Sequence, residues 1–156
     1  MSAAGSPQQH AWSTANPVFT AYVFYSCVLV LKMLATTLLV VRQRHTKKVF
    51  MNPEDKLDKN SKVLPGGDPD VERPRRAHLN DLENIPAFWV AGLLYCLTNP
   101  APALALNLFR AYTGARIMHT IVYAVVPLPQ PSRAIAWAVG YGITIYMAVT
   151  TVMHFA

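Results

Sequence analysis

The chain has 156 residues, of which 53% are hydrophobic and only 14% are charged. Soluble domains carry roughly a quarter of charged residues, so the composition favours a membrane protein. All eight acidic residues lie between positions 54 and 83, and ten of the fourteen Lys and Arg residues lie between positions 42 and 76. Because the basic and acidic side chains are interleaved there, the net charge of +6 does not indicate a nucleic-acid partner.

The two cysteines and the N-terminal tail narrow the possible classes of protein further. Cys27 and Cys96 lie in apolar runs without the spacing of a metal site or a disulfide framework, so we expect buried thiols and no metal. Residues 1–16 form a polar tail that lacks the basic region of a signal peptide. The apolar run after this tail is therefore expected to remain as a membrane anchor.

Apolar runs separated by turn signals predict an all-α integral membrane protein, a bundle of four transmembrane helices. Residues 18–41 contain a single charge, and about 20 such residues span a bilayer. The excess of Lys and Arg in the first loop places that loop in the cytoplasm. We predict helices at residues 17–44, 74–98, 103–126 and 132–154, a tail at residues 1–16 and a cytoplasmic loop at residues 45–73 within one domain of residues 17–156.

Polar residues gather near the predicted cytoplasmic end of every helix. On the second helix they recur at i, i+4 and i+7, and on the third at i, i+3 and i+7, so each set occupies one helical face. An antiparallel order brings all of them to one side of the membrane. The set comprises Arg44 on the first helix, Arg75, Arg76, His78, Asn80 and Glu83 on the second, Arg116, His119 and Tyr123 on the third, and Arg133 at the start of the fourth.

This combination of side chains favours a site for a zwitterionic small molecule with net negative charge. Charges within a membrane are costly and usually face an interior or a water-filled cavity. Guanidinium groups bind carboxylates through paired hydrogen bonds, and several arginines suit a ligand with more than one carboxylate. Glu83 can receive the ammonium group of such a ligand.

Structural alternatives stay open from the sequence alone. Glu83 can instead neutralise Lys32 or Arg116 inside the bundle, and Lys32 is expected to have a structural partner or a water-filled cavity. Arg110 lies on a different face from Arg116 and is not counted as a ligand contact. The remaining alternatives are head-group anchoring for Arg75 and Arg76, a core position for His119 and an interfacial aromatic belt for Tyr123.

Four segments resemble the signatures of the MAPEG family, the membrane-associated proteins in eicosanoid and glutathione metabolism. They are residues 49–55, 71–85, 114–120 and 127–133, and together they extend over nearly the whole chain after the tail. Within the family the similarity is greatest to the microsomal glutathione transferases of the first type and next to the prostaglandin E synthases.

The resemblance implies a homotrimer of four-helix subunits with glutathione, the co-substrate, bound between neighbours near the cytoplasmic face. It assigns glutathione contacts to Arg44, Arg75, Arg76, His78, Glu83 and Tyr123, with Asn80, Arg116 and His119 as further contributors. It gives Arg133 the catalytic role of stabilising the glutathione thiolate. It also implies the endoplasmic reticulum membrane, or alternatively the mitochondrial outer membrane.

The resulting hypothesis is a glutathione S-transferase for hydrophobic electrophiles, with peroxidase activity toward lipid hydroperoxides. The alternatives are a glutathione-dependent prostaglandin E synthase and a non-catalytic membrane adaptor. Two positions depart from the family pattern. Lys56 stands where the mammalian transferase has a cysteine that thiol reagents modify, and Ala134 stands where the prostaglandin synthase has a serine after its catalytic arginine.

Overall fold

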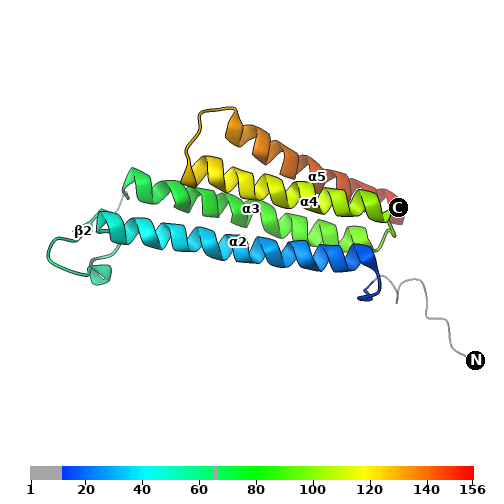
Figure 1. Ribbon diagram of the computed structural model, residues 1–156, viewed down its shortest axis with the longest axis horizontal. Helices are drawn as coiled ribbons and strands as arrows, with labels where there is room; N and C mark the ends of the chain where they lie inside the picture. Colours follow the sequence, from blue (N-terminus) through cyan, green and yellow to red (C-terminus); the bar gives the residue numbers. More distant parts are fainter. Residues whose placement is uncertain (1–11, 65–66) are drawn as a thin grey trace, which may run out of the picture.

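The computed structural model describes residues 12–64 and 67–156. The described chain forms four long antiparallel α-helices, as predicted for the fold class (Figure 1). The loop after the first helix and the connector before the last helix lie at one end of the bundle, and the C-terminus lies at the other (Figure 1). The helices are α2 (Pro17–Lys47), α3 (Pro69–Cys96), α4 (Pro102–Thr120), which continues into the π-helical turn η2 (Ile121–Val125), and α5 (Ser132–Phe155).

Capping residues explain where α2 and α3 begin. The Asn16 side chain accepts hydrogen bonds from the backbone of Val18 and Phe19, and Pro17 occupies the first helical position. The Asp68 side chain caps α3 in the same way by accepting from the N–H of Asp70. The helix therefore begins at Pro69, and not at Pro74, as the sequence analysis predicted.

The other helix ends differ from the predicted ones by a few residues. Lys48 ends α2 by adopting a left-handed conformation with φ of 51°. Its backbone N–H bonds to the last carbonyl groups of the helix, so α2 extends to Lys47 beyond the predicted end at residue 44. The third predicted helix, residues 103–126, divides into α4 and η2.

The loop between α2 and α3 is more ordered than the predicted polar segment. Strand β1 (Val49–Phe50) pairs in parallel with β2 (Lys62–Val63), and the 3-10 helix η1 (Pro53–Asp55) lies between them. Val49 and Phe50 are buried. Two-residue strands are too short to give a recognisable sequence period, so the pattern could not have predicted them.

An ion pair of 2.6 Å joins Lys48 to Asp58, and the hydrogen bond from Lys48 lowers the pKa of this carboxyl group.

Aromatic packing fills the core of the bundle. The ring of Phe88 stacks on Tyr112 with centroids 3.7 Å apart, and both side chains are fully buried. Phe109 packs edge-on against Phe88 and Tyr22. These contacts join α2, α3 and α4 at one level of the bundle.

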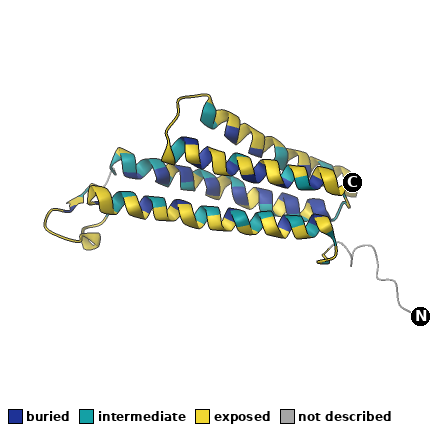
Figure 2. Ribbon diagram, viewed as in Figure 1, coloured by how far each residue is buried: buried dark blue, intermediate teal, exposed yellow. Residues whose placement is uncertain are grey.

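Exposed positions dominate α2 and α5, whereas buried positions are more frequent on α3 and α4 (Figure 2). In the described part of the chain, α2 and α5 are long and apolar enough to cross a membrane. The polar first half of α3 lowers its mean hydropathy. The polar helix α3 packs against both α2 and α5.

A small residue on α5 allows this helix to approach α4. A Cβ atom at Gly140 would lie 3.4 Å from Tyr112 and 3.5 Å from Arg116, so a methyl group fits but a longer side chain does not. We expect Gly140→Leu to destabilise the fold by about 1–3 kcal/mol through overpacking. The effect is measurable as a lower midpoint of thermal unfolding in detergent.

Gly142 provides the matched control on the same helix. A Cβ atom there meets no atom within 4 Å, so Gly142→Leu should leave the midpoint close to that of the unmodified protein. Equal destabilisation by the two substitutions would show that the contact of position 140 with Tyr112 and Arg116 is not the cause.

Candidate functional site

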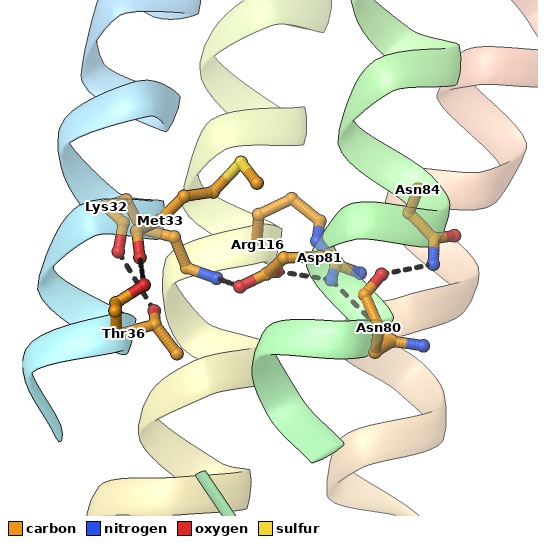
Figure 3. A network of polar contacts seen from close by, with 8 residues as sticks. Lys32, Met33, Thr36, Asn80, Asp81, Asn84 and Arg116 are labelled. Carbon is orange, nitrogen blue, oxygen red and sulfur yellow. Dashed lines mark hydrogen bonds and ion pairs between the residues drawn. The ribbon is translucent and has the colours of Figure 1, made fainter. Parts of the chain in front are cut away.

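A buried carboxylate joins three helices near the middle of the bundle. Asp81 on α3 forms ion pairs with Lys32 on α2 and with Arg116 on α4, whose Nη2 lies 2.6 Å from Oδ1 (Figure 3). Asn80 supports the same arginine, because its Oδ1 accepts a hydrogen bond of 2.9 Å from Nη2. We refer to Lys32, Asp81 and Arg116 as the charge triad.

The triad decides between two interpretations of the sequence. Lys32 has a structural partner, as expected, but the alternative that Glu83 neutralises Lys32 or Arg116 is wrong. Asp81 does so, because it is fully buried, whereas Glu83 is exposed. The two acids are two residues apart, about 200° around the helix, so they face opposite sides of α3. Asp81 was not among the predicted site residues, because the predicted polar face of this helix carries Arg76, Asn80 and Glu83.

Arg116 faces the interior of the bundle. Its side chain is 1% exposed, and its Nε and Nη1 atoms have no hydrogen-bond partner among the described residues. It lies outside the residues that line the two hollows described next. Arg116 therefore connects Asp81 and Asn80 to α4 rather than presenting its charge at an open site.

Two adjoining hollows share the side chains of Tyr123 and Arg133, and we call them together the Arg133 cleft. The first, the basic hollow, has a volume of about 310 Å³ and is lined by Arg73, Arg76, Val122, Tyr123, Pro127, Leu128 and Arg133. The second, the aromatic hollow, has a volume of about 260 Å³ and is lined by His119, Tyr123, Gln130, Arg133, Ala134 and Trp137.

Arg133 is held in place by an aromatic ring. Its guanidinium carbon lies 4.8 Å from the ring centre of Tyr123, within the range of a cation–π interaction. The Nε atom of Arg133 is buried without a hydrogen-bond partner among the described residues. The Tyr123 ring thus restrains the Arg133 guanidinium at the point where the two hollows meet.

Tyr123 reaches the cleft from a π-helical turn. The five residues of η2 wind more widely than an α-helix, and such turns are often found at functional sites. The ring of Tyr123 lies 5.6 Å from that of His119, which is buried. The prediction that His119 and Tyr123 share a face assumed a uniform α-helical period. The helix changes to a π-helical turn at Ile121, but the two rings still lie close together.

Arg73 is a further residue of the cleft and was not among the predicted site residues. It lies on α3 one turn before Arg76, so both guanidinium groups reach the basic hollow. The prediction that the helix begins at Pro74 had left Arg73 in a loop. Three arginines and no acidic side chain line this hollow, which makes it suited to an anion.

The other predicted residues lie away from the cleft within one chain. Arg75 is engaged by Glu72, with a closest distance of 2.6 Å. Arg44 and His78 each have a buried ring or guanidinium nitrogen without a described partner, and Glu83 is exposed. The ten predicted residues therefore form three groups: Arg76, His119, Tyr123 and Arg133 at the cleft, Asn80 and Arg116 at the triad, and Arg44, Arg75, His78 and Glu83 elsewhere. Within the described ranges, no cluster of three His, Cys, Asp or Glu side chains could hold a metal ion.

Comparison with known proteins identifies the family. The family model described as "MAPEG family" matches residues 22–153. The chain belongs to the MAPEG family. It is a homologue of microsomal glutathione S-transferase 1, an enzyme, with 48% identity to the proteins of Homo sapiens and Mus musculus over 137 residues, which cover 85% of this chain and 88% of each relative. Prostaglandin E synthase of Homo sapiens is 34% identical over 128 residues, covering 82% of this chain and 84% of that protein. This MAPEG protein is thus a helical membrane protein, as the composition predicted.

The triad predicts that one carboxylate controls the stability of this MAPEG protein. We expect Asp81→Asn to lower the free energy of unfolding by about 3–5 kcal/mol, because two buried cations lose their counter-charge. Thermal unfolding in detergent, followed by circular dichroism, measures the effect.

Glu83→Gln is the control, since it removes the same charge from an exposed position on the same helix. It should change the midpoint far less than Asp81→Asn. A midpoint that falls equally in both variants would contradict the structural role given to the triad.

Proposed function

We propose that this protein is a glutathione S-transferase that binds glutathione in the Arg133 cleft and conjugates it, through its thiol sulfur, to hydrophobic electrophiles. The observation that carries the proposal is the junction, at Arg133, of a hollow lined by arginines with a hollow lined by aromatic side chains. Homology to microsomal glutathione S-transferase 1 supports it.

The basic hollow suits the carboxylates of glutathione. Arg73 and Arg76 stand on one face of α3, and guanidinium groups bind carboxylates with paired hydrogen bonds. Glutathione carries two carboxylates and one ammonium group, and Glu83, which is exposed, offers an acceptor for the ammonium. Asn80 and Arg116 act in this proposal by positioning α3 against α4.

A homotrimer would bring the separate groups of predicted residues together. Within one chain, Arg44, Arg75, His78 and Glu83 do not line the cleft. We propose that these residues complete the cleft of a neighbouring subunit, near the cytoplasmic face of the endoplasmic reticulum membrane or of the mitochondrial outer membrane. Cross-linking in native membranes, followed by mass determination, tests the trimer.

Arg133 is the residue that we assign to catalysis. A free thiol has a pKa near 8.5, and the thiolate is the reactive species. The Arg133 guanidinium stabilises this anion, and the N-terminus of α5 adds a partial positive charge at the same place. The thiolate attacks an electrophilic carbon, a C–S bond forms, and the leaving group departs with the bonding electrons.

The same thiolate can reduce a lipid hydroperoxide. It attacks the terminal oxygen of the O–O bond, which yields a glutathione sulfenic acid and, after protonation, an alcohol. A second glutathione converts the sulfenic acid to the disulfide and water. Ala134 and Trp137 line the aromatic hollow beside Arg133 and offer an apolar surface for either acceptor.

Prostaglandin H to E isomerisation is the second candidate, which the 34% identity to prostaglandin E synthase favours. Product analysis with the endoperoxide separates it from conjugation. A non-catalytic adaptor would bind glutathione in a calorimeter but turn over neither substrate.

Substitution of Arg133 tests the catalytic assignment. We expect Arg133→Gln to lower kcat/KM for a chlorodinitrobenzene about 10²- to 10³-fold, the effect of removing one donor from a developing anion. The pH–rate profile should also shift to higher pH, because the bound thiol loses the charge that lowers its pKa. Arg133→Lys should recover part of the rate.

A profile that keeps its midpoint in Arg133→Gln would assign the arginine to binding alone. Calorimetry with glutathione separates the two cases, since a thiolate role predicts a larger loss in rate than in affinity. Arg42→Gln, an exposed arginine outside the cleft, serves as the control for net charge.

Lys56 predicts how the enzyme responds to thiol reagents. This exposed residue directly follows η1, where the resemblance places a reactive cysteine. We expect N-ethylmaleimide to leave the conjugation rate unchanged in the natural protein and to alter it in Lys56→Cys. A strong rise in the rate of the natural protein would show that another thiol regulates the enzyme.

A further inference from the structure

An arginine on the outer surface of α4 belongs to neither the charge triad nor the Arg133 cleft. Arg110 is exposed, and its Nε atom donates a hydrogen bond of 3.0 Å to the hydroxyl group of Tyr25 on α2. Tyr25 lies eight residues after Pro17, and Arg110 lies eight residues after Pro102. At about 1.5 Å per residue, both stand roughly 12 Å from the end of the bundle that carries the 99–102 turn.

The hydrogen bond leaves donors on both side chains. The Tyr25 hydroxyl accepts from Nε, so its own proton is available to another acceptor. The two terminal nitrogens of Arg110 point to no carboxylate, because the ion pairs found among the described residues do not include Arg110. The pair therefore presents a positive charge and several donors to the outside of the bundle.

The distribution of charge along the chain argues that the counter-ion is not a side chain of this protein. All eight acidic residues lie between positions 54 and 83, so they belong to the loop and to the first half of α3. The last of them, Glu83, is about 20 Å from the end of α3 nearest to Arg110. That is about 8 Å deeper in the membrane than Arg110.

The surface around the pair is apolar. Phe24 is 60% exposed, and its ring packs edge-on against Tyr25 with centroids 5.1 Å apart. Leu31, two turns deeper on α2, is 66% exposed. A long arginine side chain within a few turns of the membrane surface extends toward the head groups while its methylene groups stay in the apolar layer.

We propose that Arg110 and Tyr25 form a binding site for the phosphate group of a membrane phospholipid. The leaflet is the one at the 99–102 end of the bundle. The guanidinium and the phenol hydroxyl donate to the phosphate oxygens, and an acyl chain runs along Phe24 and Leu31. The site is separate from the Arg133 cleft and does not depend on the proposed glutathione reaction.

Native mass spectrometry of the delipidated protein in detergent tests this site. The protein is titrated with palmitoyl-oleoyl phosphatidylglycerol, with the matching phosphatidylcholine, and with a diacylglycerol that lacks phosphate. Both phospholipids should bind, and the diacylglycerol should not. Arg110→Gln should weaken phospholipid binding at one site per chain about ten- to a hundredfold, the effect of losing one charged hydrogen bond.

Conservative variants keep the test independent of folding. Arg110→Lys should retain part of the affinity, and Tyr25→Phe should weaken binding less than Arg110→Gln. Lys59→Gln removes the same charge from the exposed loop and should leave this site intact.

Three outcomes would overturn the proposal: equal binding by the unmodified protein and Arg110→Gln, equal loss in Lys59→Gln, or equal binding of the diacylglycerol. Dissociation of an oligomer by Arg110→Gln, with the lipid count per chain unchanged, would instead assign the arginine to a contact between subunits.

Discussion

The Asp81 carboxylate is shared between Lys32 and Arg116, and this arrangement ties α2, α3 and α4 together at one level of the bundle. A charge within a membrane costs at least about 2.5 kcal/mol, so each of the three groups depends on the others. The constraint also explains why α3 is polar over half its length. Its inner face meets charges from two neighbouring helices, and its first turns carry the arginines of the cleft.

The triad separates the charges that hold the protein together from the charges that can bind a ligand. Arg116 is buried and paired with Asp81 inside the bundle, whereas Arg73, Arg76 and Arg133 surround an open hollow. The triad and the cleft are connected through α3, because Asp81 lies about two turns after Arg73 on this helix. They are also connected through α4 and η2. His119 lies three residues after Arg116 and its ring is close to that of Tyr123, which in turn contacts the Arg133 guanidinium. Because the triad holds α3 against α4, it also restrains the distance between the arginines of α3 and Tyr123 at the end of α4.

The sequence predicted the four helices because long apolar runs and proline-rich turns are strong signals. It could not predict that Asp81, rather than Glu83, is buried, because both lie on α3 and only the packing of α2 and α4 distinguishes their faces. Arg73 was missed because Pro74 looked like a helix start, although Asp68 caps the helix earlier. The catalytic role of Arg133 was predicted from the family resemblance alone. The structure adds its cation–π contact with Tyr123, which no sequence pattern indicated.

The π-helical turn η2 has a consequence for how the family can vary. A wide turn holds one residue more than an α-helical turn of the same rise, so removing a single residue from the segment would restore the ordinary period. The helix on either side would keep its register, but the side chains within the turn would shift around the helix axis, and the Tyr123 ring would move away from the Arg133 guanidinium. Insertions and deletions in this stretch should accordingly be rarer among functional relatives than substitutions, since the length of the segment, more than its composition, sets where the ring points.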